Sequence, residues 1–199
     1  VPEDFRAGLL DYRGSGYTRG HMASAGNFAN STQEAMDETF LLSANVVPQE
    51  GVNNGDAWFR LEHLSRQIAR MVGKDAFILS GPLFLPHTVP ESEDPDANIS
   101  RYRRKCDKKY VTYEVLGERN VAVPTHLFKI FVSIREDGTA ATAAFIVENK
   151  ANKKNLKLED YMVPLSRVEG HAGFKVLASA PKTDLCGLKD NQIDCEKFF

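Results

Sequence analysis

The chain has 199 residues and a formal net charge of −2, from 25 lysines and arginines against 27 aspartates and glutamates. This length suits one domain with a sizeable core, and no apolar run approaches the length of a membrane helix. The near-balance of charge excludes a general basic field, so a polyanion would have to be held by a local patch of cations. No signal peptide is present, and because the chain starts at Val1 we expect a processed or truncated protein.

The first half of the chain predicts two helices and a strand between them. Ser31 to Glu34 is a capping-box pattern and predicts a short helix. The run 40–47, "FLLSANVV", indicates a buried strand that Pro48 ends. The segment 53–73 then carries apolar residues at helical spacing with a glycine stop: Trp58, Leu61, Ile68, Met71 or Val72, and Gly73.

The second half is richer in strand patterns. Residues 76–85 are apolar and typical of a strand, 86–109 form a polar loop, and 110–117 alternate as a strand does. The clearest hairpin lies in 125–149, with Asp137-Gly138 as its turn. A second capping box, Ser166 to Glu169, predicts a short helix, and the last 25 residues show no strong period. The pattern is α+β: a mostly antiparallel sheet with a few helices.

The stretch "YTRGHMASAGN" is poor material for a core and carries the first candidate chemistry. Arg19 and His21 lie two residues apart, so on an extended segment their side chains share a face. A guanidinium that binds an anion and an imidazole that titrates near neutral pH suit a phosphate with a water to be deprotonated. A lone histidine is more often structural, so this pair needs support from elsewhere.

That support comes from three residues in the second predicted helix. Asn54, Trp58 and Glu62 recur every four residues and project from one side of a helix. An amide oxygen is a hard, neutral ligand suited to Mg²⁺. The alternative is that Asn54 or Asp56 caps the helix while Glu62 pairs with Arg66. That alternative explains the helix, but not the order strand, loop, strand, helix with a histidine on the first strand.

Several long strings resemble one known family, the DNA/RNA non-specific endonucleases with a ββα-metal site, in the endonuclease G and exonuclease-G-like branch. They are "FRAGLLDYRGSGYTRGHMASAGN", "AMDETFLLSANVVPQEGVNNGDAWFRLE", "SGPLFLP", "YVTYEVLG", "NVAVPTHLFKI" and "LEDYMVPLSRVEGHAG". The resemblance implies a ββα-metal nuclease domain over 1–175, a mostly antiparallel central sheet flanked by helices, and a C-terminal extension over 176–199. The family usually has strands upstream of "FRA" that these 199 residues do not contain, so we expect an edge of the sheet to be missing, exposed or supplied by other sequence.

The resemblance also implies an activity, metal-dependent hydrolysis of DNA and RNA to 5′-phosphate and 3′-hydroxyl products, with Mg²⁺ as cofactor and Mn²⁺ as a substitute. Thr18 departs from the aspartate of many members and is closer to the exonuclease-G-like "SRGH". The implied site comprises a general base, a metal ligand, an acidic residue near the metal, a further asparagine and two phosphate-facing arginines: His21, Asn54, Glu62, Asn45, Arg19 and Arg6.

Homodimerisation and a mitochondrial location are implied by the resemblance alone. A competing function is a non-catalytic nucleic-acid-binding module that uses the basic loop 101–109. There we expect contacts to the phosphate backbone of the nucleic acid from Arg101, Arg103, Arg104 and Lys105. A thiol hydrolase built on Cys106 would need a paired histidine that the sequence does not suggest. Cys186 and Cys195 could form a disulfide or remain two free thiols.

Overall fold

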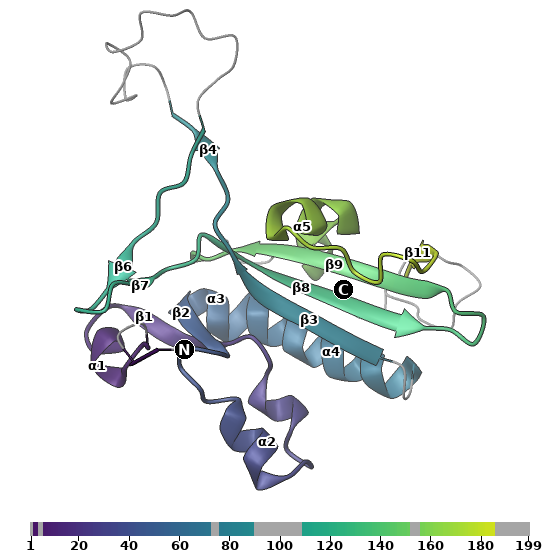
Figure 1. Cartoon of the computed structure of the whole chain (residues 1–199), viewed down its shortest axis with the longest axis horizontal. Coiled ribbons are helices and arrows are strands. Elements are labelled where there is room, and N and C mark those ends of the chain that lie inside the picture. Colours follow the sequence, from purple (N-terminus) through teal and green to yellow (C-terminus); the bar gives the residue numbers. More distant parts are fainter. Residues whose placement is uncertain (1, 4–5, 73–75, 90–108, 152–155, 186–199) are drawn as a thin grey trace, which may run out of the picture.

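A computed structural model describes residues 2–3, 6–72, 76–89, 109–151 and 156–185. Its centre is a sheet with the long helix α4 (Phe59–Val72) on one face and the helix α5 (Leu165–Ala172) on the other, as Figure 1 shows. The predicted α+β class, a mostly antiparallel sheet flanked by helices, is therefore confirmed. Within the described part of the chain, no helix is both long enough and apolar enough to span a membrane.

The central sheet is built on the hairpin predicted over 125–149. Strands β8 (His126–Ile134) and β9 (Ala140–Glu148) pair antiparallel, and β3 (Ala76–Leu83) continues the sheet beside β8. Gly138, at φ +80°, makes the turn. On the far side of β9 lie two short strands, the antiparallel β10 (Met162–Val163) and the parallel β11 (Lys182–Asp184).

Alternate residues of β8 enter two hydrophobic cores, one on each face of the sheet. Leu127 and Phe131 pack with buried residues of α4 and β9: Leu61, Leu64, Ile68, Phe145 and Val147. Their neighbours along the strand pack on the α5 side in the second core, which includes Phe128, Ile130, Val132, Ala144, Val168 and Val176. The sheet therefore has no solvent-facing side along β8, and it provides a rigid support for the elements at its end.

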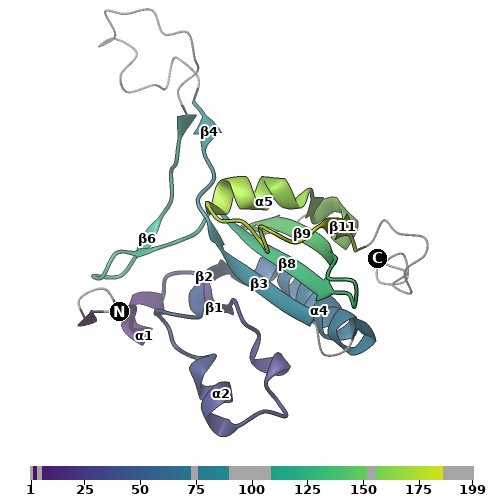
Figure 2. The same ribbon diagram turned by 45° about the vertical axis from the view of Figure 1, so that its right-hand side comes forward.

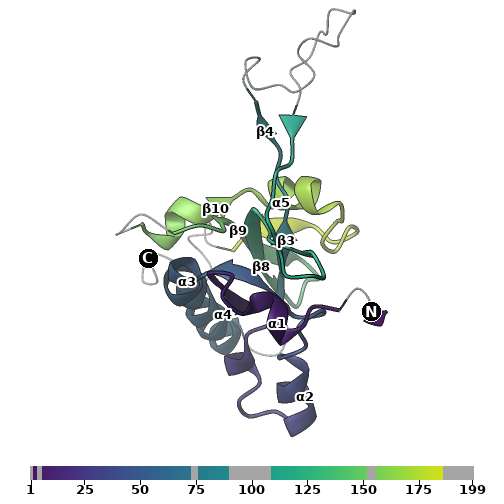
Figure 3. The ribbon, with the colours of Figure 1, turned by 90° about the vertical axis from the view of Figure 1, so that its left-hand side faces the viewer.

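Those elements form a ββα unit. Strand β1 (Tyr17–His21) pairs antiparallel with β2 (Val46–Glu50), and the chain then enters one helical rod: α3 (Gly51–Asn53), a π-helical turn η3 (Asn54–Trp58) and α4. Figure 1 shows β1, β2 and α3 near one another at one end of the sheet, and Figure 3 shows α3 leading into α4. A short helix α1 (Leu9–Tyr12), a 3₁₀ turn η2 (Ala25–Asn27) and α2 (Gln33–Glu38) complete this end. The helix α2 lies below β1 and β2, away from the sheet (Figure 2).

The remaining strands lie outside the central sheet: in Figure 1 β4 projects away from the sheet, whereas β6 and β7 lie near α1 and β1. Strands β4 (His87–Thr88) and β5 (Lys109–Tyr110) pair antiparallel, as do β6 (Val115–Leu116) and β7 (Val121–Ala122). A 3₁₀ turn, η6 (Leu158–Tyr161), precedes β10. The predicted DNA contacts at 101–105 and all three cysteines lie outside the described residues.

Two strand predictions were wrong in extent. The strand expected over 40–47 begins only at Val46 and includes Pro48 instead of ending there. Among the described residues, β2 pairs with β1 alone, and a strand paired on one side tolerates a proline because the missing N–H need not enter a ladder. The strand expected over 110–117 is limited to the ends of that run in β5 and β6, and Val111 and Tyr113 between them are about half exposed.

Both capping-box patterns correctly predicted a helix, but the residue predicted to cap each helix was wrong. The first helix is capped by Thr32, whose hydroxyl accepts a hydrogen bond from Ala35 N at 3.2 Å. The second follows Pro164 without a side-chain cap, because the Glu169 carboxylate bonds Val176 N at 3.0 Å and Lys175 instead. A domain boundary at residue 175 stays a prediction, although residues on both sides of it pack in the same core.

Candidate active site

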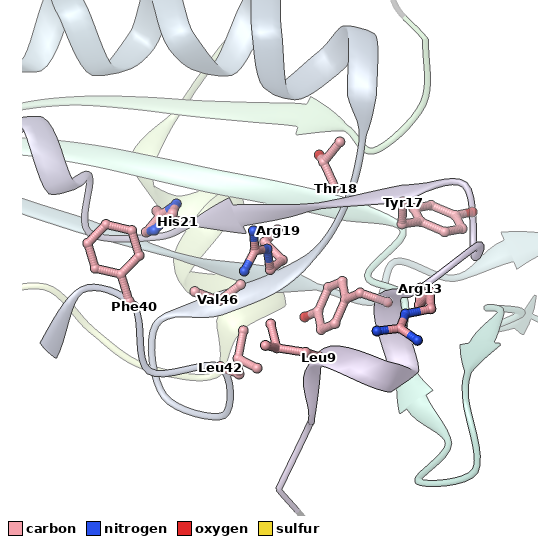
Figure 4. Close-up of a pocket in the computed structure, with 10 residues that line it drawn as sticks. Leu9, Arg13, Tyr17, Thr18, Arg19, His21, Phe40, Leu42 and Val46 are labelled. Atoms are coloured by element: carbon pink, nitrogen blue, oxygen red, sulfur yellow. The ribbon is translucent and has the colours of Figure 1, made fainter. Parts of the chain in front are cut away.

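Strand β1 directs Arg19 and His21 into one pocket of about 840 Å³. Both side chains leave the same face of the strand in Figure 4, and Thr18 points to the other side. The shared face predicted from their spacing is therefore confirmed. The pocket is lined by residues of α1, β1 and the segment before β2: Leu9, Tyr12, Arg13, Tyr17, Thr18, Arg19, His21, Phe40, Leu42 and Val46.

The environment of His21 favours its neutral form. Burial is the main cause of a pKa lowered below the ordinary value of 6.5; the charge of Glu62 opposes this shift and that of Arg19 adds to it. The Phe40 ring meets the imidazole edge-on, with 5.0 Å between ring centroids. Its Nε2 finds no hydrogen-bond partner among the described residues. A half-buried, neutral imidazole without such a partner can accept a proton from a bound water.

The backbone around His21 contacts residues of β2 and η3. Trp58, which is fully buried, donates a hydrogen bond from Nε1 to the carbonyl oxygen of His21 at 3.0 Å. Behind the strand, Gly20 faces the side chain of Gln49, where an added Cβ would lie 1.9 Å from Oε1. A glycine between the arginine and the histidine is therefore required by the packing of β1 on β2.

The structure separates the two adjacent asparagines. Asn53 is fully buried; its Oδ1 accepts a hydrogen bond from Gln49 Nε2 at 2.6 Å and its Nδ2 donates to the carbonyl of Glu148 at 2.8 Å. Asn54 is only half-buried and stands at the first position of the π-helical turn, a rare geometry that recurs at functional sites. Asn53 thus joins the helix to β9, and Asn54 is the asparagine whose side chain reaches the surface.

Thr18 determines which end of the Asn54 amide faces outward. The Thr18 hydroxyl donates to the carbonyl of Gln49 at 2.8 Å, so its oxygen is left to accept a hydrogen bond from Asn54 Nδ2 at 3.1 Å. The Nδ2 end of the amide is occupied in this way, while Oδ1 has no hydrogen bond from a described residue. A neutral carbonyl oxygen held in this orientation fits a Mg²⁺ ion, which takes oxygen ligands and keeps several of its waters.

Glu62 is half-buried on α4, and its charge acts on two groups. It raises the pKa of His21 and also that of Lys129, a fully buried lysine of β8. The alternative pairing with Arg66 is not what the structure contains, because Arg66 contacts Asn27 at 3.3 Å and Ser24 at 3.5 Å. Across the described ranges, no three carboxylate, imidazole or thiol side chains gather as a metal-binding cluster.

The remaining predicted site residues lie in different surroundings. Asn45 uses its whole amide in binding backbone: Oδ1 accepts from Ala23 N at 2.7 Å, and Nδ2 donates to the carbonyls of Ala23 and Thr39, each at 2.8 Å. It fastens the segment that follows His21. Arg6 is exposed and does not line the pocket.

Arg13 lines the pocket although the sequence analysis did not select it. No periodicity connects it to Arg19, because the turn between α1 and β1 brings the two together. The only available signal was its place inside the same conspicuous string of residues, "DYRGSGYTRGH".

Comparisons with known proteins identify the family of the chain. The family model described as DNA/RNA non-specific endonuclease matches residues 1–183. The chain is 42% identical over 177 residues to "Nuclease EXOG, mitochondrial" of Mus musculus, covering 87% of this chain and 43% of that protein. It is 38% identical over 169 residues to "Endonuclease G, mitochondrial" of Bos taurus, covering 85% of this chain and 50% of that protein.

A solved structure supports the same assignment. The crystal structure of the EndoG/EndoGI complex matches with a TM-score of 0.74 and 36% sequence identity, over 88% of this chain and 65% of the matched chain. The chain spans about half the length of the curated relatives it matches. On the family match and the shared fold together, the chain belongs to the DNA/RNA non-specific endonuclease family.

Proposed function

We propose that the chain is the catalytic part of a metal-dependent nuclease that hydrolyses phosphodiester bonds of DNA and RNA without sequence specificity. The observation that carries this proposal is the pocket in which a half-buried His21 with a lowered pKa lies beside Arg19. Membership of the family and the names of the nuclease relatives support the same substrate class.

In the proposed reaction, neutral His21 accepts a proton from a water that attacks the phosphorus atom in line with the leaving group. The bond between phosphorus and the 3′ oxygen breaks, and that oxygen takes a proton from solvent. The products carry a 5′-phosphate and a 3′-hydroxyl. Arg19, on the same face of β1, compensates the negative charge that gathers on the phosphate oxygens.

We propose that Asn54 holds the cofactor Mg²⁺, or Mn²⁺ as a substitute, through Oδ1. When bound, the ion supplies positive charge that stabilises the departing oxygen. Thr18 keeps the amide turned so that Oδ1 faces outward, and Glu62 would hold water around the bound ion. With one neutral protein ligand, affinity for the ion in the absence of substrate is expected to be weak.

Two predicted residues receive more distant roles. Asn45 positions the segment after His21, because its Oδ1 accepts from Ala23 N and its Nδ2 donates to the carbonyls of Ala23 and Thr39. Arg6 contacts a phosphate further along the substrate. The basic loop 101–109 adds contacts to the phosphate backbone of the nucleic acid. Such contacts do not distinguish bases, which agrees with a lack of sequence specificity. Because the similar nucleases include mitochondrial ones, we propose a mitochondrial location. From the family resemblance we propose a homodimer.

The test is cleavage of circular DNA, linear DNA and RNA with Mg²⁺, with a chelator, and with the ends of the products mapped. We expect metal-dependent cleavage with 5′-phosphate ends, and its loss in Asn54→Ala. Binding of all three substrates without any cleavage would replace the nuclease with the competing hypothesis, a binding module. Activity that survives chelation, or full activity of Asn54→Ala, would contradict the role of the metal.

A further inference from the structure

Lys129 is a buried charge that the proposed reaction does not use. It lies in the middle of β8, is 1% exposed, and stands between Leu127 and Phe131 on the face that packs against α4. Burial is the main cause of a pKa lowered to about 8, while Glu62 raises this pKa and Arg66 lowers it. An ammonium removed from water is costly, and apolar residues of similar size often replace buried charges without loss of stability. The core therefore does not require a lysine at this position.

The contacts of the ammonium group show where its charge acts. Nζ donates to Ser80 Oγ at 2.8 Å and to the carbonyl oxygen of Met22 at 3.5 Å. It also lies 4.3 Å from the centre of the Trp58 ring, a distance at which a cation is attracted to the face of an indole. Met22 directly follows the proposed base, at the point where β1 ends.

Two consecutive carbonyls at that point are thus held from inside the core. Trp58 binds the carbonyl of His21 at 3.0 Å, and Lys129 binds that of Met22 while its charge rests against the Trp58 ring. The two side chains come from different elements, Trp58 from η3 and Lys129 from β8. Together they connect the backbone of the base to the rigid centre of the sheet.

We propose that Lys129 is a positioning residue of the nuclease site. Its charged ammonium group holds the backbone at His21 and Met22, and the Trp58 ring, in a fixed position relative to the central sheet. The inference rests on the proposed function. It assigns to a core residue, remote from substrate, the placement of the imidazole relative to the attacking water. Geometric errors of this kind reduce turnover much more than substrate binding.

The first test is Lys129→Met, which keeps length and packing and removes the charge, with the exposed Lys157→Met as the control for a lost positive charge. We expect a melting temperature equal to or above that of the wild type. We also expect kcat to fall at least about tenfold, as for other residues that orient a site from behind, and KM for DNA to change less than about twofold. A kcat within twofold of the wild type, or a lower melting temperature with unchanged kcat per folded molecule, overturns the proposal.

A second variant keeps the proposal testable if Lys129→Met does not fold. Ser80→Ala removes the shortest hydrogen bond to the ammonium, so the charged form loses a partner and the pKa of Lys129 falls further. Glu62 and Arg66, the ionised side chains that act on it, are unchanged. The decline of kcat at alkaline pH, expected near pH 8 in the wild type, should move to lower pH. An alkaline decline at the same pH in both proteins contradicts the proposal.

Including His21→Ala in the same assay separates a failure of the role proposed for Lys129 from a failure of the proposed nuclease function. Full activity of His21→Ala would refute the proposed base, whatever Lys129 does. An inactive His21→Ala together with a fully active Lys129→Met refutes only the role of the lysine.

Discussion

Replacing Thr18 with valine is expected to weaken metal binding while leaving the fold intact. The substitution keeps the shape of the side chain and removes the oxygen that donates to Gln49 at 2.8 Å and accepts from Asn54 Nδ2 at 3.1 Å. Thr18 is exposed, so the two hydrogen bonds contribute little to folding, about 1 kcal/mol each at most. The Asn54 amide then turns freely and presents Oδ1 to the ion only part of the time.

Loss of a group that orients a metal ligand typically costs about 10- to 100-fold in metal affinity. At about 1.4 kcal/mol for each factor of ten, this is roughly 1.4 to 3 kcal/mol. The assay is the Mg²⁺ concentration that gives half-maximal cleavage, together with direct binding of Mn²⁺ in the absence of DNA. The control is Thr18→Ser, which keeps the hydroxyl and should stay within about threefold of the wild type. Equal metal affinity of the valine and serine variants would show that Thr18 does not orient Asn54.

Three further substitutions test the packing and the charges of the site. Gly20→Ala should prevent β1 from pairing normally, because its Cβ would lie 1.9 Å from Gln49 Oε1; a folded, active variant by circular dichroism and cleavage would refute this. Asn53→Ala should lower the free energy of unfolding by at least about 2 kcal/mol in urea titration, since it leaves buried partners without hydrogen bonds, but the Mg²⁺ requirement of the folded enzyme should not change. Glu62→Gln removes a charge that raises the pKa of His21, so the acid limb of the kcat profile should move to lower pH; a shift to higher pH would contradict the assigned electrostatics.

Local patterns predicted the elements that are defined by their own sequence. The hairpin β8–β9 could be found because two apolar runs flank Asp137-Gly138, and Gly138 adopts the positive φ that such a turn needs. The helix α4 followed from its apolar spacing. The boundaries of β2 and the two helix caps could not be found in the same way. The bounds of β2 depend on its pairing with β1, which is distant in sequence. The first cap is local, from Thr32 to Ala35, and lies one residue after the predicted Ser31, whereas the Glu169 carboxylate bonds Val176 N beyond the end of its helix.

Some site residues could likewise be found from local patterns, and others could not. Arg19 and His21 were placed together by strand alternation alone, and the structure confirms that they share a pocket. The choice of Asn54 rested on its helical spacing with Trp58 and Glu62 and on resemblance. The structure adds an observation that no local pattern contains: the neighbouring Asn53 is hydrogen-bonded to Gln49 and Glu148 inside the fold. The orienting hydroxyl of Thr18 and the ammonium group of Lys129 were likewise hidden, because each acts through a contact between separate elements.

The most direct test of the proposed mechanism is the turnover of His21→Ala on supercoiled DNA with Mg²⁺, measured beside its DNA affinity and its melting temperature. The proposed base predicts that kcat falls at least about 10²-fold, while affinity and melting temperature remain close to those of the wild type. Cleavage at a near-normal rate by the folded variant would contradict the assignment of His21 as the group that activates the attacking water.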